Sequence, residues 1–192
     1  RAAHFKKHSP YMKIAVCGCM TQEESAVEKI KKSYPYVDLI FGTHNLFCFP
    51  QYLCEVYESK NGGFDPKGHK ITQIWDATDE IVEDLPVERK YSYKSGINIM
   101  FGCDNYCTYC IVPYVRGHER SRQPGDIIRE CEKLAADGVV EVMLLGQNVN
   151  SYGRDLETPC SFAELLSAVA EVPGIKRVRF MTPHPKDMGR DV

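Results

Sequence analysis

The sequence is short of three features that would assign it to a class at once. No apolar run in its 192 residues approaches the roughly 18 needed to cross a membrane, and no secretory signal opens it. The net charge is only −2, which excludes a uniformly basic nucleic-acid binder but not a local basic face. With 43% hydrophobic and 26% charged residues, the composition excludes a disordered, collagenous or coiled-coil chain.

The ends of the sequence carry no recognisable start or stop. It begins Arg1-Ala-Ala-His without an initiator methionine, and the stretch 188–192 contains no terminating signal for any element. We therefore interpret the sequence as an internal fragment of a longer protein. Its length fits one large domain, or one small domain with part of another.

Cysteine is the residue type in excess. Nine cysteines are an odd number in a chain without a signal peptide, whereas disulfide frameworks belong to secreted chains with paired cysteines. We expect a reducing cytoplasm, where clustered cysteines usually indicate metal or redox chemistry.

The first third predicts a small α/β layer. Residues 13–16 and 37–41 are short apolar runs, each closed by a glycine, and indicate buried strands. Thr21 and Glu24 fit a capping box that opens a helix to about Ser33. A second helix is expected from Thr43 to about residue 59. This strand–helix order favours a parallel sheet.

The segment 60–95 is rich in glycine, proline and charge, and only 71–75 resembles a strand, so we predict a linker there. The remainder reads as βαβαβ. Strands are expected at 96–101, 140–145 and 176–181, with one helix from Pro124 to Gly138 and another opened by a Ser161–Glu164 capping box. Right-handed connections would give an open parallel sheet or the first part of a β/α barrel.

Three cysteines lie within eight residues directly after the strand at 96–101. Cys103, Cys107 and Cys110 form a CxxxCxxC pattern at the strand end where parallel α/β sheets place their sites. They could be incidental buried residues, or a zinc site with His118 as an isolated fourth ligand. A three-cysteine [4Fe–4S] cluster explains the count better, because it leaves one iron open to a substrate or cofactor.

This pattern resembles the signature of the radical S-adenosylmethionine (SAM) superfamily, with Tyr109 as the aromatic residue before the last cysteine. The resemblance implies that the open iron binds SAM. One electron from the cluster then cleaves a C–S bond, and the resulting 5′-deoxyadenosyl radical removes a hydrogen atom from an unactivated C–H bond. The cofactor carries this chemistry, and the protein positions and shields it.

Two further stretches, 110–122 and 141–153 (EVMLLGQNVNSYG), look like the methylthiotransferases, the second resembling the MiaB-type branch. That branch makes 2-methylthio-N6-isopentenyladenosine next to the tRNA anticodon. The resemblance covers about 13–45 and 97–185. It implies the C-terminal part of a small α/β N-terminal domain at 1–59, the linker at 60–95, and the first half of a radical SAM partial β/α barrel at 96–192.

The resemblance also implies cofactor-binding residues. Gly146, Gln147 and Asn148 occupy the place where such enzymes hold the methionine part of SAM, although the usual acidic residue is missing. Cys19 matches the third ligand of a second [4Fe–4S] cluster, whose first two cysteines would lie upstream; Cys17 is not assigned. The four other cysteines are expected to pack as small hydrophobic residues: Cys48, Cys54, Cys131 and Cys160.

Some polar residues keep two interpretations. Arg116, Arg120 and Arg122 form a basic cluster that could face phosphate or the SAM carboxylate, or simply be solvated. His184, between two prolines after the last predicted strand, is either a loop residue or part of the site. Pro183 replaces a hydroxyl residue expected in the family.

The resemblance implies two partners. One is the tRNA anticodon stem-loop, which must present an unstacked adenine, and the other is an electron donor such as a flavodoxin-type protein. No membrane is expected, and the sequence does not determine the sulfur source. The alternatives are a sister methylthiotransferase acting on threonylcarbamoyladenosine in tRNA or on a ribosomal-protein aspartate, and a zinc-stabilised RNA-binding module without catalysis.

Overall fold

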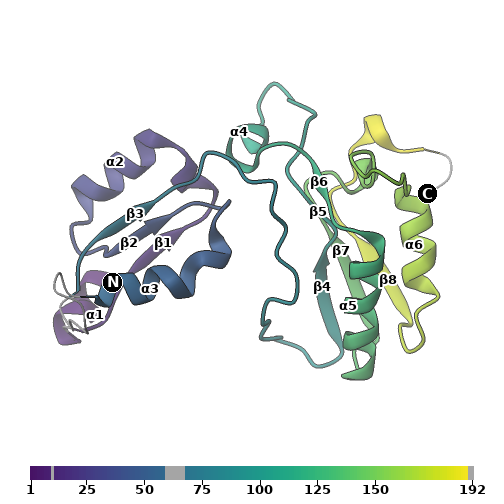
Figure 1. Cartoon of the computed structure of the whole chain (residues 1–192), viewed down its shortest axis with the longest axis horizontal. Helices are drawn as coiled ribbons and strands as arrows, with labels where there is room; N and C mark the ends of the chain where they lie inside the picture. The colour runs from purple at the N-terminus through teal and green to yellow at the C-terminus, as the bar shows by residue number, and fades with distance from the viewer. Residues whose placement is uncertain (10, 59–67, 190–192) are drawn as a thin grey trace. The chain divides into compact units, whose positions relative to one another are not determined.

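The chain forms two compact units, Arg1–Thr78 and Asp79–Val192 (Figure 1). The structure is a computed structural model, and it describes residues 1–9, 11–58 and 68–189. No helix within these ranges is long and apolar enough to cross a membrane.

The first unit contains a parallel sheet of three strands in the order β1-β2-β3. Both neighbours pair in register with the central strand, so that Leu39 lies opposite Ala15 on one side and Ile71 on the other. The elements are α1 (Ala2–His8), β1 (Ala15–Cys17), η1 (Cys19–Gln22), α2 (Glu24–Ser33), β2 (Leu39–Phe41), η2 (Leu46–Cys48), α3 (Phe49–Tyr57) and β3 (Ile71–Gln73).

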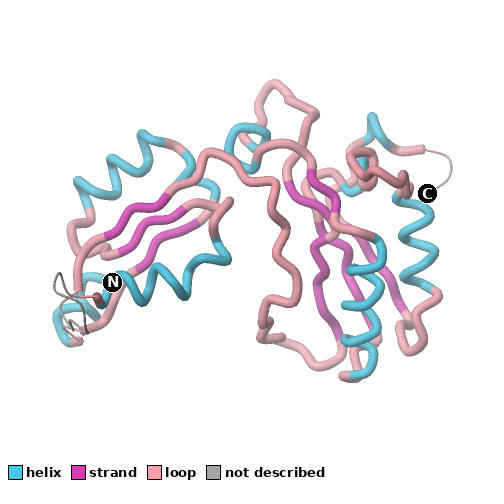
Figure 2. Tube along the Cα trace, in the orientation of Figure 1, coloured by secondary structure: helices cyan, strands magenta, loops and turns pink. Residues whose placement is uncertain are grey.

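Helices cover both faces of this first sheet (Figure 2). Successive side chains of a strand point to opposite faces. Leu39 and Phe41 accordingly pack with Val56 of α3, whereas Ile40 between them packs with Val27 of α2. The central strand is therefore buried on both sides, which explains its uninterrupted apolar run.

The second unit contains another three-stranded parallel sheet, in the order β4-β7-β8. A two-stranded antiparallel ribbon of β5 and β6 follows the first of these strands. The elements are β4 (Lys94–Asn98), β5 (Met100–Phe101), α4 (Val112–Arg116), β6 (Arg120–Ser121), α5 (Pro124–Ala136), β7 (Glu141–Leu145), η3 (Val149–Ser151), α6 (Phe162–Ala170), β8 (Arg177–Phe180) and η4 (Pro185–Asp187).

Among the described residues, α5 and α6 cover one face of this second sheet. Val142 and Leu144 point to the same face, and they share one core with Ile127 of α5 and Leu165 of α6. The opposite face is polar where β7 and β8 begin, because Glu141 pairs there with Arg177 at 2.9 Å.

The expected parallel α/β architecture is confirmed, and so is one of the two capping boxes. The Ser161 hydroxyl accepts from the Glu164 amide at 3.2 Å, and the Glu164 carboxylate accepts from the Ser161 amide at 2.7 Å. The Thr21 prediction is wrong, because that residue lies in a 3-10 turn before α2. Its buried hydroxyl donates to the Phe41 carbonyl at 2.6 Å, a partner from the neighbouring strand.

The structure places ordered elements inside the segment 60–95 that was predicted as a linker. Residues 71–73 form β3 and complete the first sheet, and the boundary between the units falls at Thr78. Beyond it, the segment packs on the second unit, where Glu83 pairs with Arg122 and the Tyr93 carbonyl accepts from the Val140 amide at 2.9 Å. Residues 59–67 lie outside the described residues.

Candidate functional site

Loops that follow the three strands of the second sheet meet at its carboxyl edge. Parallel strands all end at the same edge, and hydrogen bonds join the chain segments there. The Ile99 amide donates to the Leu145 carbonyl at 2.8 Å, and the Thr182 hydroxyl donates to the Gly146 carbonyl at 2.7 Å. The cysteine loop, the loop after β7 and the segment after β8 are therefore held side by side.

The cysteine loop is closed at its base by the β5–β6 ribbon. The predicted strand 96–101 breaks at Ile99, so that Met100 and Phe101 leave the main sheet and pair with Ser121 and Arg120. The next residue must be glycine. Gly102 has φ +75°, and a Cβ there would lie 1.9 Å from the His118 carbonyl oxygen.

The structure places the three predicted thiols in this one loop. Cys103 is buried and donates its amide to the Gly117 carbonyl at 3.1 Å, while Cys107 and Cys110 are half-buried and joined by a 2.8 Å backbone hydrogen bond. Burial raises the pKa of the Cys103 thiol, and nearby Cys110 and Cys107 add to the increase. The raised pKa means that burial disfavours the thiolate form, and a bound cation would offset this penalty.

The thiols are not arranged as a finished metal centre. Across the described part of the chain, no three His, Cys, Asp or Glu side chains form a group that could hold a metal ion. His118, the possible fourth zinc ligand, contacts Asp104 Oδ1 at 2.7 Å through Nδ1. The imidazole that reaches a thiol is instead His184, whose Nε2 lies 3.5 Å from Cys107 Sγ.

The loop after β7 contains buried amide oxygens that lack hydrogen-bond donors. Asn148 is 1% exposed and Asn150 8% exposed, and the Oδ1 atom of each, like Gln147 Oε1, has no hydrogen-bond partner among the described residues. Unsatisfied buried acceptors are rare and call for an explanation such as a bound ligand. Gly146 permits a close approach, since a Cβ there would lie 2.6 Å from Met100 Cγ.

Asp187 joins all three segments. Its carboxylate accepts from Asn148 of the β7 loop at 2.8 Å, from Arg154 at 2.8 Å and from Asn105 of the cysteine loop at 3.3 Å. Burial alone would raise the pKa of this carboxyl, but hydrogen bonds from Asn148, Arg154 and Asn105 bring it below its usual value. Asp187 therefore connects the cysteine loop to the β7 loop in the charged form.

The structure corrects the predicted arginine cluster at Arg122. Arg122 lies between β6 and α5. It is buried and pairs with Glu83 and, at 2.8 Å, with Glu130 of α5. Burial lowers the pKa of its guanidinium, yet the two carboxylates raise it above the usual value. Arg120 lies over the Phe101 ring at 5.8 Å. Arg122 thus serves the core and is not available to an anion.

Comparison with known protein families identifies the family of the second unit. Residues 97–191 match the family model described as the Radical SAM superfamily. The second unit belongs to the radical SAM superfamily. The matched range includes the three cysteines and all three strands' carboxyl ends.

Curated relatives resemble this chain along nearly its whole length. A protein of Lachnoclostridium phytofermentans named tRNA-2-methylthio-N(6)-dimethylallyladenosine synthase is 57% identical over 98% of the chain and 40% of its own length. Proteins with the same name from Clostridium tetani and Clostridioides difficile are 55% and 53% identical, over 97% and 98% of the chain. The chain spans about 40% of the length of these relatives.

The cysteine loop and the helix α4 that follows it carry exposed tyrosines. Tyr109, predicted to contact the cofactor, is 94% exposed. Tyr106 and Tyr114 are also exposed and contact each other edge to face, with centroids 5.8 Å apart. Tyr106 has φ +45°, a left-handed conformation that is uncommon for a residue other than glycine. Its ring contact with Tyr114 accompanies this conformation.

The carboxyl edge of the first unit holds the remaining predicted ligand. Cys17 ends β1 and is exposed, and Cys19 begins η1. Gln22 binds this edge together, because its side chain accepts from the Thr43 amide at 3.1 Å and donates to the Trp75 carbonyl at 2.8 Å. Of the unassigned cysteines, Cys131, Cys48 and Cys160 pack against cores as expected, whereas Cys54 is exposed.

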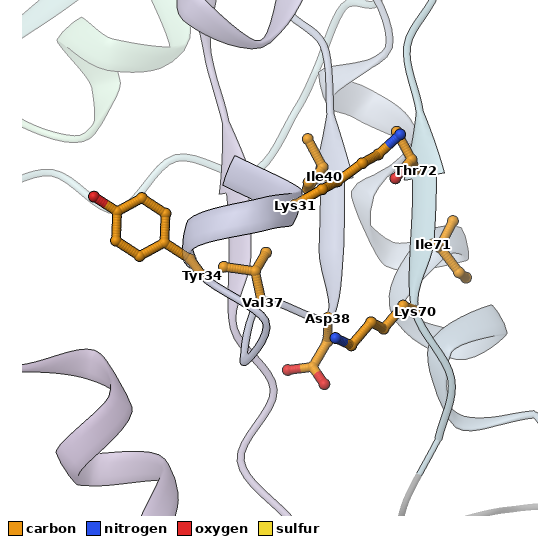
Figure 3. A pocket seen from close by; sticks show the side chains of 8 residues that line it. All are labelled: Lys31, Tyr34, Val37, Asp38, Ile40, Lys70, Ile71 and Thr72. Atoms are coloured by element: carbon orange, nitrogen blue, oxygen red, sulfur yellow. The ribbon is translucent and has the colours of Figure 1, made fainter. Parts of the chain in front are cut away.

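A cavity of about 200 Å³ lies at the opposite edge of the first sheet (Figure 3). Val37 and Ile40 line it together with Lys31 from α2. Its charged groups already have partners: Asp38 pairs with Lys6, and Lys70 donates to the Pro35 carbonyl. Parallel sheets place their sites at the carboxyl edge, so this cavity is not a candidate site.

Sequence reasoning missed Asp187, Asn105 and Asn150 as members of the site. These residues lie in loops without periodicity, and their partners lie 33 to 82 residues away. The useful signal was only positional, since each follows a predicted strand.

Proposed function

We propose that the full-length protein is a radical SAM tRNA methylthiotransferase that converts the C2–H bond of N6-isopentenyladenosine, next to the anticodon, into C–S–CH3. The observation that carries this proposal is 57% identity, across 98% of the chain, to a protein named tRNA-2-methylthio-N(6)-dimethylallyladenosine synthase. The loop geometry supports it, because three thiols lie at the carboxyl edge of a parallel sheet.

Cys103, Cys107 and Cys110 are the proposed ligands of a [4Fe–4S] cluster. The donor set fits, since clusters are held by cysteine thiolates and none of these three forms a disulfide. With SAM bound, such a cluster supplies the electron that generates a 5′-deoxyadenosyl radical. The protein's part is to hold the loop: the β5–β6 ribbon closes its base and Asp187 ties its middle to the neighbouring loop.

Gly146, Gln147 and Asn148 are the proposed residues for the methionine part of SAM. The unpartnered oxygens Gln147 Oε1 and Asn148 Oδ1 are acceptors, and the ammonium group of SAM offers three N–H donors. These two oxygens can accept hydrogen bonds from the SAM ammonium group, as the acidic residue does in other radical SAM enzymes. Tyr109, with its exposed ring, can cover the cofactor from the cysteine loop.

Cys19 is proposed as one of three ligands of a second [4Fe–4S] cluster involved in sulfur handling. The other two would come from parts of the protein outside residues 1–192. The radical SAM unit would thus generate the radical, and the first unit would serve the sulfur that is inserted. SAM also supplies the methyl group.

The proposed macromolecular substrate is the anticodon stem-loop of tRNA. An adenine inside a stack cannot present C2 to a buried site, so the base must be unstacked. The electron donor is proposed to be a flavodoxin-type protein, and the thiol chemistry suits a reducing cytoplasm.

Two measurements test the proposal on the full-length protein. Anaerobic reconstitution should give a brown protein with about four iron and four sulfide per cluster; a colourless protein with one zinc contradicts it and supports the RNA-binding module. Mass spectrometry of tRNA nucleosides from a deletion strain should show loss of 2-methylthio-isopentenyladenosine. Loss of the threonylcarbamoyl derivative instead would point to the sister enzyme.

A further inference from the structure

One ring nitrogen of His184 is engaged by the backbone. Its Nδ1 accepts a hydrogen bond from the Lys186 amide at 3.2 Å. An imidazole nitrogen that accepts carries a lone pair, so in the neutral ring the proton resides on Nε2. That Nε2 atom lies 3.5 Å from Cys107 Sγ, within hydrogen-bond reach of a sulfur atom. The backbone therefore selects the tautomer that can donate to the thiolate.

We propose that His184 donates an Nε2–H hydrogen bond to the Cys107 thiolate and thereby raises the reduction potential of the cluster that this cysteine holds. The inference deepens the proposed function and rests on it, because it takes Cys107 as a cluster ligand. His184 is a positioning and tuning residue, since it acts through the sulfur and not on the substrate.

The surrounding chain keeps the imidazole in this place. Pro183 and Pro185 restrict the backbone on both sides of His184. One turn further on, Asp187 accepts from Asn105, two residues before Cys107. The β8 segment thus contacts the cysteine loop twice, once through the carboxylate and once through the imidazole. Two contacts on one loop define the orientation better than one.

The direction of the effect follows from charge. A reduced cluster carries one more negative charge, which is shared by its sulfur ligands, so a donor to a sulfur stabilises the reduced form more than the oxidised form. Hydrogen bonds to the sulfurs are one of the factors that set cluster potentials. Removing the donor should make the cluster harder to reduce.

The test is a potentiometric titration of the full-length, anaerobically reconstituted protein, followed by EPR of the signal that responds to added SAM. In His184→Ala, iron and sulfide content should equal wild type, because all three thiols remain. The potential should fall by the equivalent of about tenfold in the reduced-to-oxidised ratio, the lower end of the effect that losing an outer partner has on metal affinity or activity, or about 59 mV for a one-electron couple.

Two variants separate hydrogen bonding from general disturbance of the loop. His184→Gln retains an N–H donor and should recover much of the potential. His118→Ala is the matched control, because His118 contacts the same loop through Asp104 and no thiol; it should titrate as wild type.

Three results would overturn the inference. An unchanged potential in His184→Ala with a full cluster rejects the hydrogen bond while leaving the proposed function intact. Loss of iron in that variant would make His184 a ligand and not a donor. A wild-type protein that assembles no iron–sulfur cluster rejects both the inference and the proposed function.

Discussion

In the described part of the chain, each unit contains a three-stranded parallel sheet, but helices cover both faces of the first sheet and one face of the second. In the first unit, Ile40 packs toward α2 while Leu39 and Phe41 pack toward α3. In the second, α5 and α6 share one face and Glu141 with its two arginines occupies the other. The common feature is the carboxyl edge, where both units collect cysteines.

The two edges are assembled by different chemistry. In the first unit, neutral amides join the strand ends: Asn45 donates to the Gln73 carbonyl at 3.0 Å and accepts from the Gly42 amide at 3.1 Å. In the second unit, the charged Asp187 joins the loops. The comparison teaches that the same strand arrangement can hold a cysteine loop with or without a buried charge.

The largest expected effect comes from removing one cysteine at the carboxyl edge of each unit. Cys107→Ala should abolish the reductive cleavage of SAM, because two thiols should not retain the radical SAM cluster. Cys19→Ala should keep SAM cleavage and lose the methylthiolated nucleoside. The measurements are 5′-deoxyadenosine formation and tRNA nucleoside analysis in the full-length protein. Normal 5′-deoxyadenosine formation in Cys107→Ala would falsify the ligand assignment.

A smaller but still large effect is expected from the buried ion pair of the second unit. Arg122→Ala leaves Glu83 and Glu130 without their cation and should lower the free energy of unfolding by about 3–5 kcal/mol. Arg177→Ala is the control, because the exposed Arg177 guanidinium shares Glu141 with Arg179; it should cost about 0–1 kcal/mol. Denaturant unfolding of the full-length protein measures both; equal costs would contradict the burial argument.

Asn45→Ala tests the amide-built edge. The side chain is fully buried and also donates to the Tyr52 hydroxyl at 2.8 Å, so truncation should cost about 1–3 kcal/mol by leaving its partners unsatisfied. Hydrogen exchange should show the loss of protection in β1, β2 and β3. Equal loss in β4 and β7 would show that the two units do not respond separately.

The smallest effect is a pH dependence that only the second edge should show. Hydrogen bonds lower the folded-state pKa of Asp187, so its contribution is present above the ordinary carboxyl pKa near 3.9 and disappears as pH falls through the folded value. Asp187→Asn should therefore be less stable than wild type at neutral pH, and the difference should shrink toward acid. A constant difference between pH 7 and pH 3 would refute the charged role.

The elements that could be predicted are those in which local sequence decides the outcome. The Ser161 capping box involves residues three apart, and the helix predicted from Pro124 is observed as α5. The CxxxCxxC loop was also placed correctly after its strand, because spacing along the chain carries the motif.

The predictions that failed depended on distant partners. Thr21 has the spacing of a cap, but the Phe41 carbonyl, twenty residues away, takes its hydroxyl. Arg122 follows Arg116 and Arg120 in the sequence, where a solvated cluster was one interpretation, yet Arg122 is buried in ion pairs with Glu83 and Glu130. In both cases a tertiary hydrogen bond or ion pair outweighs the local pattern.

The sequence alone determined the strand–helix order, the three-thiol loop and the family to which the second unit belongs, because these depend on residue types at fixed spacing. Only the tertiary structure decided which groups meet that loop. His184 reaches Cys107 across 77 positions, and Asp187 reaches Asn105 across 82. Parallel strands bring such residues to one edge, and no periodicity along the chain records which loops will face each other there.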